Sequence, residues 1–177
     1  PLIKFFSANG LDVFDAERVD THGGSLRVYA QPVGGPYKRE SAVSEFVAQE
    51  EALGLFDVET YLDWDKRIRT LGHRLNTTLK HFKSSGLRIA GFGAPAKATT
   101  LLHQFGIGPS VVDFIVEDSR WKQGLFLPGL GIPIVAPDGN PTDHADVLLV
   151  LAWNFAGPIM KMHERYGTDI GSFIVPM

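Results

Sequence analysis

Cysteine is absent from the 177-residue sequence. The chain therefore has no disulfide framework, no thiolate metal ligand and no cysteine nucleophile. An absence of disulfides fits a protein of the reducing cytoplasm, and a cytoplasmic location is what we expect.

Long apolar runs and a large excess of one charge are also absent. The longest apolar run, Val147 to Trp153, is far shorter than the roughly 20 residues of a membrane-spanning helix. The N-terminus has no apolar segment typical of a signal peptide. The formal net charge is only −3, which argues against a surface for nucleic acid or anionic membranes. We therefore expect neither nucleic acid nor a membrane as a partner.

Metal and hydrolase signatures are missing as well. Five of the six histidines do not pair with another histidine or an acidic residue at metal-binding spacing, namely His73, His81, His103, His144 and His163. No Ser-His-Asp set surrounds a nucleophile elbow. We expect no metal in this chain and no hydrolase chemistry. The sequence starts at Pro1, without methionine, in a stretch with the pattern of a helix, so we expect it to be part of a longer protein.

The residues that are present have an ordinary globular balance, with 44% hydrophobic and 21% charged. Residues 11–31 have a β-like pattern around the turn-prone Gly23-Gly24 pair, which indicates a hairpin. Apolar residues recur at helical spacing over residues 39–85, with Asp57 placed to begin a second helix and Gly86 to end it. We expect this segment to be a helical arm.

Strands and helices alternate in the rest of the chain. The expected strands are residues 87–92, 111–116, 132–135, 147–152 and 173–175, and the expected helices are residues 96–105 and a helix from its N-cap Asn154 to residue 166. Because parallel strands require crossover connections, this alternation predicts an α/β fold with a Rossmann-like, doubly wound, mostly parallel sheet. The expected division of the chain is residues 1–37, a helical arm at 38–85, and a Rossmann-like domain at 86–177.

A glycine loop, Gly91-Phe92-Gly93-Ala94-Pro95-Ala96-Lys97, lies where the first of these strands gives way to a helix. Such glycines allow a tight turn, and the N-terminus of the following helix can face a phosphate. Glu117 and Asp118 end the second strand, where a dinucleotide-binding domain has its ribose-binding acid. The alternative is a plain strand-turn-helix corner with Lys97 as a solvated cation, and the pattern alone does not decide between the two.

Longer motifs resemble those of S-adenosylmethionine-dependent sugar C-methyltransferases and occur in the same order. The glycine loop and its helix look like those of the C-terminal domain of this family. The other similar strings are Thr21-His22-Gly23-Gly24-Ser25-Leu26-Arg27, Glu117-Asp118, Lys122-Gln123-Gly124, Pro128-Gly129, Ile132-Pro133-Ile134, Ala152-Trp153-Asn154-Phe155 and Phe173-Ile174-Val175-Pro176. The resemblance covers essentially the whole chain, with residues 1–37 as the tail end of a methyl-donor domain.

The resemblance implies an enzyme of three parts: a zinc-binding N-terminal segment, a middle domain that binds S-adenosylmethionine, and a Rossmann-like C-terminal domain. The implied substrate is a nucleotide-linked deoxyketosugar, typically a thymidine diphosphate sugar, held between the last two parts. A base removes a proton beside the sugar ketone, and the enolate attacks the methyl group of the donor. The zinc segment and the donor-binding loop have no counterpart in this sequence, so we expect the chain alone not to catalyse methylation.

One group of candidate residues follows the hairpin turn. The resemblance favours a catalytic role for His22, and histidine can exchange protons near neutral pH; the alternatives are a neighbour of the base or a turn histidine bonded to its own backbone. The expected substrate-binding residues beside it are Gly23, Gly24, Ser25 and Arg27. Arg27 could bind a diphosphate or a carbonyl, or simply face solvent.

A second group belongs to the Rossmann-like domain. The expected substrate-binding residues there are Gly93, Ala94, Pro95, Lys97, Asp118, Lys122, Gln123, Trp153 and Asn154. Trp153 could stack on a base or fill a seam between domains. Two other functions stay open, namely a small NAD(P)- or CoA-binding Rossmann module and a non-catalytic domain whose helical arm mediates dimerisation. A homodimer is therefore a possible assembly.

Overall fold

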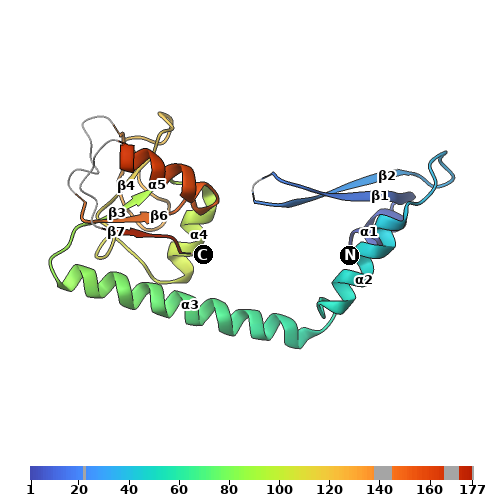
Figure 1. Cartoon of the computed structure of the whole chain (residues 1–177), viewed down its shortest axis with the longest axis horizontal. Coiled ribbons are helices and arrows are strands. Elements are labelled where there is room, and N and C mark those ends of the chain that lie inside the picture. The colour runs from blue at the N-terminus through green and yellow to red at the C-terminus, as the bar shows by residue number, and fades with distance from the viewer. Residues whose placement is uncertain (22, 138–144, 166–171, 177) are drawn as a thin grey trace. The chain divides into compact units, whose positions relative to one another are not determined.

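The computed structural model describes residues 1–21, 23–137, 145–165 and 172–176. Its contacts form two compact units, Pro1–Asp65 and Lys66–Met177, and the boundary between them falls inside a long helix. Figure 1 labels most of the helices and strands of both units. The division into three parts at residues 37 and 85 concerns the longer family architecture and stays a prediction.

The first unit is built on an antiparallel hairpin. Its elements are α1 (Leu2–Ala8), β1 (Leu11–Val19), β2 (Ser25–Pro32) and α2 (Ser41–Ala52). Val13 and Ala16 of β1 and Val43 of α2 are buried, and all three line one largely apolar hollow. The hairpin predicted around Gly23-Gly24 is confirmed, and so is the change to helices after residue 39.

Helix α3 (Val58–Ser84) follows and enters the second unit. Leu75 and Leu79 lie four residues apart, hence on one helix face, and both are buried in the core of that unit. Near the end of α3 the Lys83 ammonium lies 2.5 and 2.7 Å from the two carboxylate oxygens of Asp113. Gly86 then ends the helix with a φ of +82°, a left-handed conformation that glycine adopts without strain.

The second unit contains a five-stranded sheet in the order β5-β4-β3-β6-β7. The strands are β3 (Ile89–Phe92), β4 (Phe114–Val116), β5 (Ile134–Val135), β6 (Val147–Val150) and β7 (Ser172–Ile174), and every pairing is parallel. The helices are α4 (Ala96–Gln104) and α5 (Ala156–Arg165). The predicted parallel α/β sheet is confirmed.

Helices cover both faces of this sheet, because successive strand residues point to opposite sides. One core cluster joins alternate strand residues to α3 and α4 and includes Ile89, Ile115, Leu149, Leu79 and Leu102. The other joins the intervening strand residues to α5 and includes Ala90, Val116, Leu148 and Ile159. This two-sided core is what makes the sheet doubly wound.

Two local expectations need correction. The second strand begins at Phe114 and not at Val111, because the amide of Val111 donates to the Gly108 carbonyl in a turn. Asn154 does not directly precede α5, so its predicted position as N-cap is wrong. It is the middle residue of the 3-10 turn η2 (Trp153–Phe155), which forms because the Phe155 amide donates to the Ala152 carbonyl at 2.8 Å.

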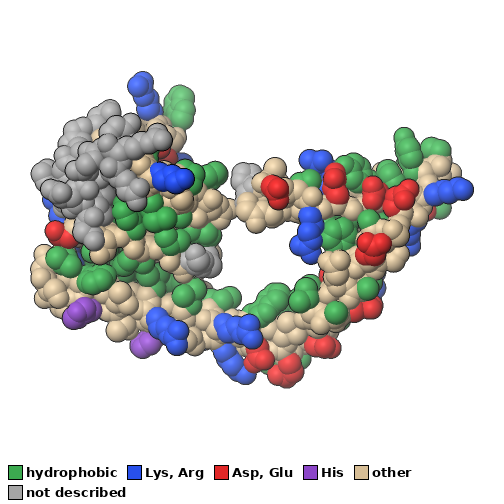
Figure 2. All heavy atoms as spheres, in the orientation of Figure 1, with side chains coloured by type: hydrophobic (Ala, Val, Ile, Leu, Met, Phe, Trp, Pro, Cys, Tyr) green, Lys and Arg blue, Asp and Glu red, His purple; other side chains and the backbone are tan. Residues whose placement is uncertain are grey.

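The surface carries both signs of charge. Figure 2 shows acidic and basic side chains over the first unit and along α3. Among the described residues no helix is long and apolar enough to cross a membrane. Helix α3 has the length, at 27 residues, but charged residues recur throughout it.

Candidate functional site

The carboxyl ends of β3 and β6 lie side by side in the middle of the sheet. The strand order reverses between these two strands, and open α/β sheets bind ligands at such a switch point. A crevice of about 280 Å³ lies there, lined by Phe92, Gly93, Pro95, Glu117, Asp118, Lys122, Ala152, Phe155 and Ile159. Four of the predicted substrate-binding residues thus meet in one crevice: Gly93, Pro95, Asp118 and Lys122.

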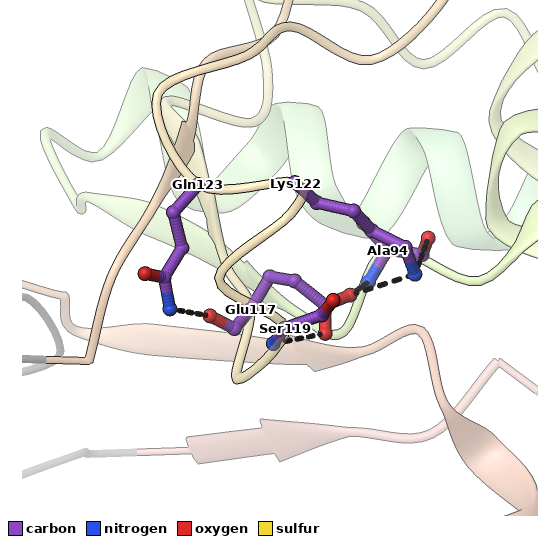
Figure 3. Close-up of polar contacts among 5 residues, drawn as sticks. All are labelled: Ala94, Glu117, Ser119, Lys122 and Gln123. Atoms are coloured by element: carbon purple, nitrogen blue, oxygen red, sulfur yellow. Dashed lines mark hydrogen bonds and ion pairs between the residues drawn. The ribbon is translucent and has the colours of Figure 1, made fainter.

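The carboxylate of Glu117 ties the glycine loop to the loop that follows β4 (Figure 3). One of its oxygens accepts the Ala94 N–H at 2.8 Å and the Lys122 ammonium at 3.3 Å, and the other accepts the Ser119 N–H at 3.0 Å. Lys122 also donates to the Ala94 carbonyl at 3.0 Å, and the Gln123 amide donates to the Glu117 carbonyl at 2.8 Å. Three predicted substrate-binding residues, Ala94, Lys122 and Gln123, therefore meet at Glu117, one of the two acids indicated at the end of the second strand.

Burial of Glu117 would by itself raise the pKa of its carboxyl group. The N–H groups of Ser119 and Ala94 and the ammonium of Lys122 outweigh burial and lower the pKa below its ordinary value. The Glu117 side chain is only 12% exposed, whereas that of Lys122 is 43% exposed. The carboxylate is consequently ionised at neutral pH, and solvent screens the lysine end of the pair.

The glycine loop has few free donors for a phosphate. The Gly93 N–H donates to the Val116 carbonyl at 2.7 Å, the Ala94 N–H donates to Glu117, and Pro95 has no N–H. Loops that bind phosphate depend on free backbone N–H groups. A phosphate at Ala94 would have to displace Glu117, and the contacts predicted between the loop and a ligand stay predictions.

Lys97 and Trp153, both predicted substrate-binding residues, lie together. The Lys97 ammonium is 4.0 Å from the centroid of the Trp153 ring, within the range of a cation–π interaction. Trp153 also packs against the core cluster under α4. Trp153 therefore packs against the core and also contacts the Lys97 ammonium with its ring.

The other predicted residues of this unit differ in exposure. Asp118 and Asn154 are exposed, and Gln123 is half-buried through its bond to the Glu117 carbonyl. Asp118 lines the crevice, whereas Asn154, Gln123 and Lys97 are not among the residues that line it. Some of the predicted substrate-binding residues therefore line the crevice, and the others do not.

The residues predicted around the hairpin turn lie in the first unit. Gly23, Gly24 and Ser25 line a hollow of about 430 Å³ between the turn and α2. Both glycines have positive φ, and the Ser25 hydroxyl donates to the Thr21 carbonyl at 3.0 Å. Gly23, Gly24 and Ser25 therefore lie beside an open space, with the Ser25 side chain held by its bond to Thr21.

Arg27 stands opposite Glu17 in the register of the hairpin. Its guanidinium lies 3.0 Å from a Glu17 carboxylate oxygen, which also accepts the Tyr29 hydroxyl at 2.5 Å. The hydrogen bonds from Tyr29 and Arg27 lower the pKa of Glu17. The two charged side chains are 55% and 46% exposed, so Arg27 is paired but accessible.

His22 lies outside the described residues, so its predicted catalytic role stays a prediction. Within residues 1–21, 23–137, 145–165 and 172–176, no three or more histidine and acidic residues are grouped so that they could hold a metal ion. The expectation that this chain binds no metal remains a prediction.

The sequence indicates both Glu117 and Asp118 at the ribose position but favours only Asp118 as a substrate-binding residue, and it does not indicate Phe155 or Ile159 as site residues. Strand alternation indicates the direction of the Glu117 side chain. Glu117 lies two residues after Ile115 and should therefore point to the same side of the sheet, the side covered by α4. Asp118, the next residue, should point to the opposite side. Phe155 and Ile159 are apolar residues without a chemical motif, and no signal in the sequence predicts their place in the crevice.

Comparisons with known proteins agree with this architecture. A family model described as "C-methyltransferase C-terminal domain" matches residues 20–177. The protein named "C-methyltransferase NovU" from Streptomyces niveus is 33% identical over 176 residues, which is 99% of this chain and 42% of that protein. The chain thus spans less than half the length of this relative.

Proposed function

The chain belongs to the C-methyltransferase C-terminal domain family, and from that premise we propose that it is the nucleotide-sugar-binding part of an S-adenosylmethionine-dependent sugar C-methyltransferase. The acceptor would be a deoxyketosugar linked to a nucleoside diphosphate, with thymidine diphosphate as the favoured nucleotide. The methyl group would go to a carbon beside the sugar ketone.

The observation that carries this proposal is the crevice at the carboxyl ends of β3 and β6. Phe92, Pro95 and Phe155 give it apolar walls, while Asp118 and Lys122 supply an acceptor and a donor. Small-molecule sites commonly combine mostly apolar walls with a few convergent polar groups. A nucleotide-sugar offers rings for such walls and hydroxyl or amide groups for such side chains.

The first unit carries a second group of residues that we expect to take part in the reaction. We propose that His22 accepts the proton from the carbon beside the ketone, and that Gly23, Gly24, Ser25 and Arg27 contact the sugar or its diphosphate. The accessible guanidinium of Arg27 and the hollow beside the turn support this assignment. A histidine suits proton transfer because its ordinary pKa lies near neutrality.

The methyl donor would be bound elsewhere in a longer protein. S-adenosylmethionine supplies an electrophilic methyl group. Its ribose hydroxyls are hydrogen-bond donors, which a free carboxylate can accept. Glu117, the first of the two acids at the end of β4, is already bonded to Ala94, Ser119 and Lys122, so it is not a free acceptor for a ribose. We propose that the donor and any zinc ion belong to other parts of a longer enzyme, and that this chain alone does not catalyse methylation.

The same geometry disfavours a nicotinamide-binding module. Such a module needs free N–H groups in its glycine loop and an acid directed at a ribose. Here the N–H groups of Gly93 and Ala94 are used within the protein, and Glu117, one of the two candidate acids, is turned into the loop. A homodimer through the helical arm is a further proposal, for which α3 offers exposed apolar side chains such as Leu62 and Ile68.

Parallel calorimetric titrations test the proposed function. The chain is titrated with a thymidine diphosphate deoxysugar, with NADH and with coenzyme A under the same conditions. We expect a response to the sugar nucleotide and none to NADH or coenzyme A. Binding of NADH without binding of the sugar nucleotide would reject the proposal in favour of the Rossmann module.

A further inference from the structure

The glycine loop is filled by an anion that belongs to the protein itself. The oxygen of Glu117 that accepts the Ala94 N–H at 2.8 Å also lies 3.3 Å from the Lys122 ammonium. A backbone N–H in the loop just before a helix, together with a lysine ammonium, is a set of donors that can bind a phosphate oxygen. The Glu117 carboxylate therefore occupies the position that a phosphate oxygen would take.

Further hydrogen bonds hold the Glu117 carboxylate in this position. The second Glu117 oxygen accepts the Ser119 N–H at 3.0 Å, so the carboxylate is held at both oxygens. The Lys122 ammonium donates a further hydrogen bond to the Ala94 carbonyl at 3.0 Å. Gly93 and Pro95 provide no replacement donor, because one N–H is bonded to Val116 and proline has none.

The charges that line the crevice also disfavour a phosphate group. Its lining contains two carboxylates, Glu117 and Asp118, and a single ammonium, that of Lys122. The ammonium is already paired with Glu117. An entering diphosphate would meet an excess of negative charge in a partly desolvated place, where like charges repel more strongly than in water.

We propose that Glu117 is a specificity-determining residue, a resident anion that closes the glycine loop to phosphate groups. The inference rests on the proposed function, since it says where the diphosphate of a nucleotide-sugar cannot lie. It also gives this loop a role opposite to that of a dinucleotide-binding loop. The crevice selects for uncharged groups, and the diphosphate is bound by cations outside it.

The test uses inorganic pyrophosphate as the probe and the backbone amide signals of Gly93 and Ala94 in a nitrogen-15 NMR spectrum as the readout. In the unmodified chain we expect pyrophosphate to leave both amides unshifted. In Glu117→Ala the Ala94 N–H and the Lys122 ammonium are released together. We expect pyrophosphate to shift the Ala94 amide there, with an affinity at least about tenfold higher, as one charge-assisted hydrogen bond allows.

Asp118→Asn is the matched control, because it removes one negative charge from the next residue and leaves Glu117 in the loop. We expect no pyrophosphate response at Ala94 in this variant. Glu117→Gln provides a second way to remove the resident charge if Glu117→Ala does not fold, and we expect a weaker gain of pyrophosphate binding from it.

Three outcomes would overturn the proposal. They are a shift of Ala94 by pyrophosphate in the unmodified chain, an equal gain in Asp118→Asn, and no gain in a folded variant of Glu117. None of these readouts involves a nucleotide-sugar. If the sugar nucleotide fails to bind while pyrophosphate behaves as expected, the proposed function is rejected and the role of Glu117 stands.

Discussion

Gly93 passes so close to Ala152 that a Cβ atom on Gly93 would lie 2.9 Å from the Cβ of Ala152. The glycine also has a φ of +82°. Glycine is therefore required at this turn both by its backbone conformation and by the nearby chain that leaves β6. The crevice depends on this close approach, because Gly93 and Ala152 both line it.

The first prediction separates these two requirements. Gly86 has the same φ of +82° but open space where its Cβ would be. We expect Gly86→Ala to lower the free energy of unfolding by roughly 1–2 kcal/mol through backbone strain alone. Gly93→Ala should cost a further 1–3 kcal/mol or so, because the new methyl group overpacks against Ala152. Urea unfolding of both variants checks this, and equal losses would contradict it.

The second prediction concerns acid. The folded pKa of Glu117 is lower than its unfolded pKa, so the stabilisation from this carboxylate is complete above the unfolded pKa and is lost as the pH falls through the folded pKa. We expect the difference in unfolding free energy between the unmodified chain and Glu117→Gln to be largest near neutral pH and to shrink in the acid range. A difference that stays constant with pH would show that Glu117 does not act through its charge.

The third prediction concerns the pair of Lys97 and Trp153. A double-mutant cycle with Lys97→Met and Trp153→Leu should give a coupling of about 0.5–1 kcal/mol in the free energy of unfolding, as expected for a partly exposed cation–π pair. Lys161→Met is the control for loss of an exposed lysine on α5. No coupling between Lys161 and Trp153 is expected. Equal coupling for both lysines would show a general charge effect.

The fourth prediction concerns the contact between α3 and the sheet. Asp113 accepts hydrogen bonds from Lys83 and from the backbone N–H of Ile89, the latter at 2.9 Å. Asp113→Asn weakens both contacts, whereas Lys83→Met leaves the carboxylate on the Ile89 N–H. We expect Asp113→Asn to lower the free energy of unfolding by about 1–3 kcal/mol, and Lys83→Met to lower it less. Chemical denaturation of both variants measures this, and the reverse order would contradict it.

The fifth prediction concerns Arg27, whose pair with Glu17 is solvent-exposed. Exposed ion pairs contribute little to stability. We expect Arg27→Ala to leave the unfolding transition unchanged and to weaken binding of the sugar nucleotide about tenfold, as expected from one lost charge-assisted hydrogen bond. Glu17→Gln, which breaks the pair but keeps the arginine, should retain binding. Unchanged affinity of Arg27→Ala would show that this arginine only faces solvent.

Periodicity in the sequence predicts most of the fold because the central strands β3, β4 and β6 are buried on both faces. The run from Val147 to Val150 is fully buried in β6, as the run of apolar residues indicates. Prediction fails where hydrogen bonds outside the pattern set the local structure. The start of β4 is shifted by a turn at Gly108, and Asn154 is drawn into a 3-10 turn by the bond between Phe155 and Ala152.

The candidate site is less predictable than the fold. Family motifs identify Gly93, Pro95, Asp118 and Lys122, and these do line one crevice. They do not reveal that Glu117 takes the Ala94 N–H, because this depends on the direction of a side chain beyond the end of a strand. Glycine spacing alone cannot show whether the donors of a loop are free or already bonded.

Mapping of the binding surface tests the central claim most directly. A thymidine diphosphate deoxysugar is titrated into the nitrogen-15-labelled chain, and the amide signals of crevice residues such as Gly93, Asp118 and Ile159 are followed. We predict saturable shifts at these residues, and loss of these shifts in a folded Asp118→Asn/Lys122→Met variant. Binding that leaves the crevice signals unchanged, or no binding of the sugar nucleotide at all, would contradict the account.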